Sequence, residues 1–229
     1  MNLYLNKNIE STNKSLINIV IKIKNISMSM VSQVMADFNS KLIEQIEEIG
    51  TFEKVRKEEF YDFSLKKVQK SIKMIFNFLD ELINTAIHRE IIFYFNNILT
   101  IYFNSLNHKI LSVSSYDIKD IQALLNISQE ILKIMKKNFE KISGKNMDLG
   151  VKFLNILEQN LDYLRFQEIL FILNSNLKQI KNYLISQNCL ISITKEQFKD
   201  LLTSTFVDSE KLREMIKYIN ENVKEKKQN

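Results

Sequence analysis

The feature that most constrains this chain is the near absence of the two residues that make sharp turns. Its 229 residues include no proline and three glycines, Gly50, Gly144 and Gly150. Average usage would give about 16 glycines and about 11 prolines in a chain of this length. Turn-rich β folds depend on these residues, and parallel α/β folds use glycine in tight connections and phosphate loops. The composition therefore predicts an all-α protein built from long helices.

The clearest helical pattern lies in the second quarter of the chain. Its apolar side chains alternate at steps of three and four residues, at Leu65, Val68, Ile72, Ile75, Leu79, Leu82 and Ala86. Such a stripe is either the inner face of a helical bundle or the seam of a coiled coil. Because three heptads are short for an extended coiled coil, we favour the bundle.

Capping residues and apolar spacing together predict where the helices lie. The predicted N-caps are Thr51, Ser114 with Asp117, Thr194 with Gln197, and Asp208 with Glu210, and the clearest predicted loop is 143–146. The first 49 residues are predicted to hold one or two helices, over 8–49. The later helices are predicted at 52–86, 88–111, 115–142, 147–160, 163–187, 194–206 and 209–225. The predicted start and end of each helix are good to about 2–4 residues. The map predicts about 7–9 helices and no sheet.

The chain is expected to divide near residue 50. Residues 1–50 are predicted to be a helical or partly disordered N-terminal segment, because the stretch 2–26 is rich in Asn, Lys and Ile and is patterned less clearly. Residues 51–229 are predicted to form a C-terminal helical-bundle domain.

The sequence lacks the residue patterns of common catalytic, metal and cofactor sites. No two glycines are close enough to form a phosphate-binding loop. Cys189 is the only cysteine, and the two histidines are His88 and His108. Neither histidine follows a Glu by three residues, as a di-metal carboxylate bundle would require. We therefore expect no metal, no cofactor and no enzymatic activity.

Charge and hydropathy argue against nucleic acid and against insertion into a membrane. The net charge is +5, and the basic residues are scattered apart from a cluster near the C-terminus at 224–227. No Lys or Arg lies between Glu90 and Lys109, where the aromatic residues gather, so these aromatics are predicted to be core. The most apolar stretch, 91–103, is shorter than the roughly 20 residues that a spanning helix needs. A single cysteine agrees with a reducing compartment, and a cytoplasmic location is expected.

Three stretches follow patterns found in one known family. Residues 68–73 read Val-Gln-Lys-Ser-Ile-Lys, residues 109–120 read Lys-Ile-Leu-Ser-Val-Ser-Ser-Tyr-Asp-Ile-Lys-Asp, and 194–219 can be laid without gaps on that family's last two helices. On these stretches, residues 65–219 resemble the C-terminal helical region of the zeste-white-ten family of vesicle-tether and kinetochore proteins.

The resemblance implies an elongated stack of antiparallel helical bundles of the tether-rod type. Members of the family act at the endoplasmic reticulum, where their complex captures Golgi-derived retrograde vesicles and engages SNAREs. They also act at the kinetochore, in the complex with Rod and Zwilch that recruits dynein. The partners expected from this resemblance are other helical tether or kinetochore subunits, with SNAREs or dynein adaptors reached through the complex. Any membrane association would come from those partners.

The C-terminal pair of helices is the predicted partner site, because its match to the family has no gap. Lys199, Arg213 and Tyr218 are the predicted residues at the rim of that interface. Two other interpretations stay open, a related tether subunit such as a relative of the Rad-fifty-interacting protein, and an unrelated helical-bundle interaction protein. A helical enzyme with a lipid or isoprenoid pocket is the interpretation from another class. It would need an Asp-rich motif, and the adjacent acidic pairs of this chain lack a matching third acid.

Overall fold

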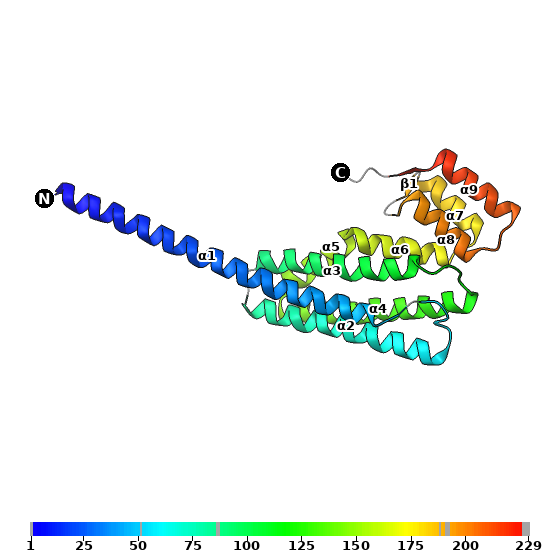
Figure 1. Cartoon of the computed structure of the whole chain (residues 1–229), viewed down its shortest axis with the longest axis horizontal. Coiled ribbons are helices and arrows are strands. Elements are labelled where there is room, and N and C mark those ends of the chain that lie inside the picture. Colours follow the sequence, from blue (N-terminus) through cyan, green and yellow to red (C-terminus); the bar gives the residue numbers. More distant parts are fainter. Residues whose placement is uncertain (1, 51, 86–87, 188, 191–192, 226–229) are drawn as a thin grey trace. The chain divides into compact units, whose positions relative to one another are not determined.

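A computed structural model describes residues 2–50, 52–85, 88–187, 189–190 and 193–225, and most of these residues are helical (Figure 1). The nine helices of this described part are α1 (Asn2–Glu47), α2 (Glu58–Thr85), α3 (His88–Leu111), α4 (Ile118–Lys145), α5 (Met147–Gln159), α6 (Leu161–Leu173), α7 (Leu177–Gln187), α8 (Lys195–Thr205) and α9 (Glu210–Asn222). The short strands β1 (Cys189–Leu190) and β2 (Lys224–Glu225) pair in parallel. The all-α prediction is confirmed, and the expectation of no sheet is wrong by this two-residue pairing.

The chain divides into two units, Met1–Lys41 and Leu42–Asn229, and each is described by itself. The first unit is α1 as far as Lys41, a single helix without a break in its described residues. The sequence has neither glycine nor proline before Gly50, so nothing in this stretch interrupts the backbone hydrogen bonds. The end of α1 belongs to the second unit.

Helix α3 organises the core of the second unit, where it packs against α2, α5, α6 and α8. Phe95, Tyr102 and Phe103 on its inner face have no exposed surface. The ring centre of Phe95 lies 4.4 Å from that of Phe153 in α5, and the ring centre of Phe103 lies 5.3 Å from that of Phe166 in α6. These aromatic residues therefore form helix-packing core, as the lack of neighbouring basic residues predicted.

The predicted apolar stripe is the inner face of α2. Val68, Ile72, Ile75 and Leu79 are all fully buried, and α2 packs against α4 and α3. Ala86, the last predicted member of the stripe, lies outside the described residues. The interpretation of this stripe as the inner face of a bundle is confirmed.

The start of α2 differs from its prediction. The helix begins at Glu58 and not at residue 52, because 52–57 form a series of turns. Lys54 within these turns has φ of 59°, a left-handed conformation that a helix cannot contain. Thr51, the predicted N-cap, lies outside the described residues.

The predicted helix 163–187 is in fact two helices, α6 and α7. Asn174 caps the C-terminus of α6. Asn176 and Gln179 then cap each other, since each side-chain oxygen accepts a hydrogen bond of 2.9 Å from the other residue's backbone N–H. This reciprocal capping starts a new helix without glycine or proline.

Two of the predicted N-caps are displaced by a few residues. The N-cap of α4 is Asp117, whose side chain accepts from the N–H two residues on, and Ser114 lies before it. The N-cap of α9 is Ser209 and not Asp208.

The predicted loop at 143–146 is wrong. Helix α4 continues to Lys145, and Asn146 alone separates it from α5. The backbone N–H of Asn146 donates to the carbonyl of Ile142, and its side-chain oxygen accepts from the N–H of Leu149 at 3.1 Å. One asparagine thus ends one helix and starts the next, so the helices reverse direction almost without a loop.

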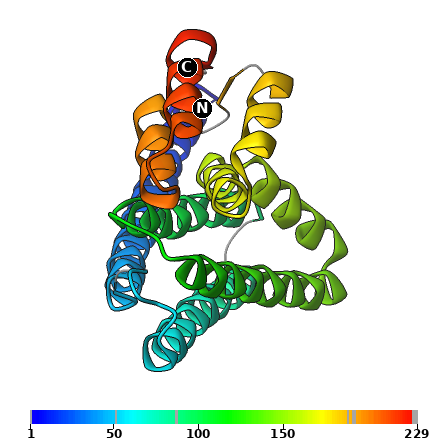
Figure 2. The same cartoon turned by 90° about the vertical axis from the view of Figure 1, so that its right-hand side faces the viewer.

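Helices α7, α8 and α9 form the C-terminal part of the second unit (Figure 2). Helix α8 packs against α6, α3 and α9, and α9 packs against α7. The β1–β2 pair joins the end of α7 to the end of α9. This part of the chain holds the predicted partner site.

Candidate interaction surfaces

The predicted partner site on α8 and α9 stands on a well-ordered helix start and a buried apolar face. Thr194 and Gln197 form the predicted capping box, with both reciprocal hydrogen bonds at 3.2 Å. Phe198, Leu202 and Ile219 point inward and have no exposed surface. The capping prediction is confirmed, and the inward faces of both helices are taken up by core packing.

Arg213, one predicted rim residue, is exposed and held in an ion pair within its own chain. Its Nε donates to Oδ1 of Asp208 at 3.0 Å, and its Nη2 donates to Oδ2 at 2.7 Å. These hydrogen bonds lower the pKa of Asp208 and raise the pKa of Arg213. A partner that binds Arg213 would therefore have to bind the Arg213–Asp208 ion pair as a unit or displace the carboxylate of Asp208.

The other two predicted rim residues lie on different faces. Tyr218 is half-buried against α7, where Nζ of Lys181 lies 5.5 Å from the centre of its ring. It follows Arg213 by five residues, which places the two side chains about 140° apart around α9. Lys199 is half-buried on α8. Among the contacts of the described residues, none joins these three side chains.

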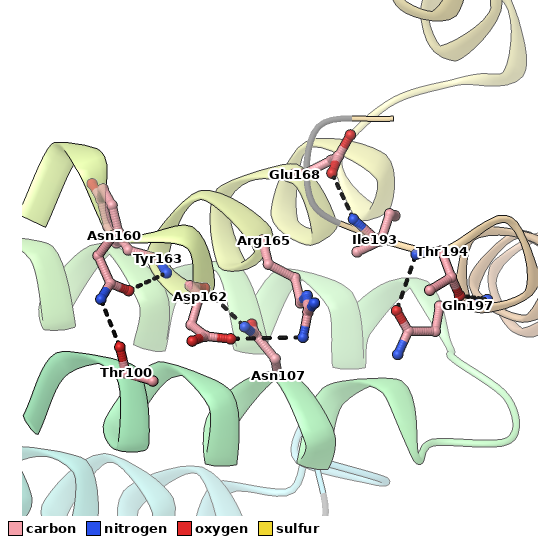
Figure 3. A network of polar contacts seen from close by, with 10 residues as sticks. All are labelled: Thr100, Asn107, Asn160, Asp162, Tyr163, Arg165, Glu168, Ile193, Thr194 and Gln197. Atoms are coloured by element: carbon pink, nitrogen blue, oxygen red, sulfur yellow. Dashed lines mark hydrogen bonds and ion pairs between the residues drawn. The ribbon is translucent and has the colours of Figure 1, made fainter. Parts of the chain in front are cut away.

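A buried carboxylate, Glu168, connects three segments, and Figure 3 shows its bond to the segment before α8. Glu168 of α6 is only 5% exposed. It accepts a hydrogen bond from the hydroxyl of Tyr183 in α7 at 3.1 Å and another from the backbone N–H of Ile193, just before α8, at 3.3 Å. Glu168 was not among the residues predicted from the sequence, because a single Glu on a helix carries no signal of burial. Its role is to hold α7 and the start of α8 against α6.

A second polar group joins α6 to α3 (Figure 3). Asn160 caps α6 by accepting from the N–H of Tyr163 at 3.0 Å, and it donates to Oγ1 of Thr100 at 3.0 Å. Asn107 donates to the carbonyl of Asp162 at 2.8 Å. Partial burial raises the pKa of Asp162, and the charge of a neighbouring arginine opposes this shift. These buried polar groups cap and connect helices, and they do not converge on a reaction centre.

Two shallow depressions lie on the second unit. One, of about 500 Å³, lies where α1 ends and α2 begins and has Ile49, Phe60 and Phe63 among its lining residues. The other, of about 350 Å³, is lined in part by His108 and Lys109. The second lining also holds Ser105 and Ser112. The hydroxyl of Ser112 donates to the carbonyl of Lys109 at 2.9 Å, and among the contacts given for the described residues none joins a serine hydroxyl to His108.

The structure bears on only part of the metal and thiol expectations. The described residues hold no group of three or more His, Cys, Asp or Glu side chains that could bind a metal ion. The side chains of His88 and Cys189 lie outside the described residues. None of the described helices is both long and apolar enough to cross a membrane.

The first unit exposes a run of large aliphatic side chains. Each is between 49% and 64% exposed, and they are Leu16, Ile17, Ile19, Val20, Ile21, Ile23, Ile26, Met30 and Val34. Five of them follow steps of three and four residues and are here called the α1 seam: Leu16, Ile19, Ile23, Ile26 and Met30. This surface was not predicted from the sequence, although the spacing that defines it is present there.

Comparisons of this chain with known protein families, with curated proteins and with solved structures found no match.

Proposed function

We propose that this chain is a non-catalytic helical subunit that assembles with another helical protein through the α1 seam. The observation that supports the proposal is the exposure of the seam: its five side chains are between 53% and 64% exposed. Contiguous apolar surface of this kind usually marks an interaction site. The non-catalytic role is supported by the buried polar groups of the second unit, which are used as helix caps and cross-links.

The free energy available from covering the seam is large enough for assembly. Full burial of a Leu, Ile or Met side chain contributes about 1.5–3 kcal/mol. Since the five seam residues are a little more than half exposed, covering them contributes roughly 4–9 kcal/mol for each helix. Two facing helices with similar seams would gain roughly twice this free energy. That gain is comparable with the cost of association, which is about 4–15 kcal/mol of lost translational and rotational freedom.

The proposal is tested by the size of the assembly in cells. The full chain and two variants, Ile19→Asp and Asn18→Asp, are expressed with a tag in the source cell, and native extracts are separated by size. Both variants add one negative charge to the same turn of α1, but only Ile19 belongs to the seam. We expect the wild type and Asn18→Asp to migrate well above the chain mass of 27.1 kDa, and Ile19→Asp to migrate at a smaller size. Equal migration of all three proteins would contradict the proposal.

We propose more specifically that the assembly is a vesicle tether at the endoplasmic reticulum or a kinetochore complex. What supports this is the resemblance of residues 65–219 to the zeste-white-ten family. The matching partner surface would be α8 and α9, with Lys199, Arg213 and Tyr218 at its rim. A triple variant, with Glu at the two basic positions and Ala at Tyr218, should lose tether or kinetochore subunits from its purified complex. Recovery of none of these subunits by the wild type would refute this assignment and leave the general one standing.

A further inference from the structure

We propose that the partner of α1 is a different, acidic protein, and that α1 lies in an apolar groove between at least two helices of that protein. This inference rests on the proposed function, which assigns the α1 seam to assembly. It adds the shape and the charge of the surface that receives α1. Two observations carry it: the width of the exposed apolar arc of α1 and the sign of the charges along this helix.

The exposed apolar side chains of α1 cover much more of its circumference than the seam does. Successive residues of an α-helix are about 100° apart, so the five residues of the α1 seam fall within an arc of about 80°. Val20, Ile17 and Ile21 extend this arc on one side, to about 140° beyond Leu16. Their side chains are between 49% and 63% exposed. The whole apolar arc is therefore about 220° wide.

An arc of this width fits a groove better than the flank of one helix. A surface helix turns an apolar stripe about 100° wide toward its core, and the seam of a coiled coil is narrower. A single partner helix on the α1 seam would therefore leave Ile17 and Ile21 exposed. A groove between two helices contacts both sides of the arc, as in other grooves that bind amphipathic helices. The face opposite the arc is left to water, and its exposed side chains include Asn18, Asn25, Ser29 and Ser32.

The charges along α1 favour an acidic partner. Residues 11–36 contain three lysines and no Asp or Glu, so two copies of α1 would bring like charges together. Lys22 is exposed at the border between the apolar arc and the polar face. Lys24 has a place in the helix between those of Val20 and Ile17, inside the arc. A surface that covers the arc must hold an acidic group near Lys24, because a buried charge without a partner is costly. Acidic side chains at the rims of the groove would also attract and orient α1.

A lipid surface suits this helix less well. Interfacial helices combine a polar face rich in Lys or Arg with Trp, Phe or Leu on the apolar face. Residues 16–34 contain one leucine, no aromatic residue and, on the polar face, the single lysine Lys22. Neither the anchoring side chains nor the dense positive charge of an interfacial helix is present in this stretch.

The first test uses the size assay of native extracts and adds Ile17→Asp to Ile19→Asp and Asn18→Asp. Ile17 lies outside the seam but inside the arc, whereas Asn18 lies on the polar face. We expect Ile17→Asp to shift the chain to a smaller size, as Ile19→Asp does, and Asn18→Asp to migrate with the wild type. Lys22→Glu combined with Lys24→Glu should also reduce the size, and the matched double change to Arg should not. Circular dichroism of each purified variant checks that its helices are intact.

The second test identifies what contacts each side of the arc. A photoreactive benzophenone amino acid replaces Ile17, Ile26 or Asn18 in the full chain in the source cell, and cross-linked peptides are identified by mass spectrometry after irradiation. Ile17 and Ile26 are about 180° apart around α1. We expect these two positions to cross-link to two different helices of one protein, with Asp or Glu near the linked residues. The probe at Asn18 should cross-link least.

Several outcomes would overturn the inference. If Ile19→Asp reduces the size of the complex and Ile17→Asp does not, or if both probes link to one helix or to a second copy of this chain, the groove is refuted and the proposed function stands. A complex that survives the double change to Glu, or linked helices without acidic residues, refutes the acidic partner. Equal migration of all variants refutes both proposals. Probes that link to lipid in place of protein also refute both and identify a lipid surface.

Discussion

Two glycines in neighbouring helices provide a matched test of how closely α4 and α5 pack. Gly144 lies near the end of α4 and Gly150 lies in α5, and neither has a positive φ. Alanine in place of such a glycine stabilises a protein by about 0.4–1 kcal/mol, because it restricts the unfolded chain. Nothing lies within 4 Å of the position that a Cβ would take at Gly144. A Cβ at Gly150 would stand 2.8 Å from Cα of Ser143, which is backbone and cannot rotate away.

Gly150→Ala must therefore push the two helices apart. Overpacking of this kind costs about 1–3 kcal/mol, and contact with backbone favours the upper part of that range. After the gain from alanine is subtracted, a net loss of about 1–2.5 kcal/mol remains. In a protein of this size, 1 kcal/mol corresponds to about 2–4 °C in Tm. We expect Gly150→Ala to lower Tm by about 2–10 °C and Gly144→Ala to raise it by about 1–4 °C.

The measurement is thermal and urea unfolding of both variants beside the wild type, followed by circular dichroism at 222 nm, the standard wavelength for helix. The comparison is internal, since the two variants make the same substitution in adjacent helices. If Gly150→Ala raised Tm as Gly144→Ala does, the close approach of α4 and α5 would be wrong. Gly150 would then be an ordinary helix position.

Three further predictions concern the second unit. Leu79→Asp places a charge at a fully buried position of α2 and should lower Tm by more than about 10 °C, whereas Asn77→Asp on the exposed face should change it by less than about 2 °C. Equal Tm values would show that the stripe is not interior. Tyr183→Phe removes the hydroxyl that donates a hydrogen bond to the buried Glu168, so it should lower the free energy of unfolding by about 1–3 kcal/mol and speed backbone hydrogen exchange in α7. Unchanged exchange would show that the bond between Tyr183 and Glu168 does not form. The pKa of Asp117 is lowered first by the N-cap hydrogen bond that its carboxylate accepts and then by its ion pair with an arginine. The carboxylate therefore contributes stability above about pH 3.9, and this stability is lost as the pH falls through the pKa of Asp117 in the folded protein. An NMR titration midpoint at or above the ordinary Asp value would contradict this.

The regular parts of the second unit were predictable because several signals agreed there. In α2, apolar residues at steps of three and four placed Val68, Ile72 and Leu79 on one face, and the low glycine content favoured helix. The capping box at Thr194 and Gln197 was equally direct, because that pattern satisfies two backbone donors at once. Both helices were therefore found: α8 was predicted to within one residue at each end, whereas the predicted start of α2, residue 52, lay six residues before the observed start at Glu58.

The breaks between helices were harder to predict, because asparagine makes them where glycine or proline was expected. Asn174, Asn146 and Asn160 each cap a helix end with a side-chain or backbone hydrogen bond. The pattern Asn176-x-x-Gln179 was a readable capping signal inside the predicted helix 163–187. It was overridden by apolar spacing that continues across the break. The buried Glu168 had no signal at all, since its burial depends on segments that are distant in sequence.

The α1 seam shows why spacing alone does not identify a functional surface. Ile72 in α2 and Ile23 in α1 both belong to runs of apolar residues at steps of three and four, yet Ile72 has no exposed surface and Ile23 is 62% exposed. Spacing determines which face of a helix is apolar, but only the presence of neighbouring helices determines whether that face is covered. For α2 the neighbours are α3 and α4 of the same unit. For residues 16–30 the first unit, a single helix, supplies no second helix, so within that unit the same spacing leaves the apolar face exposed.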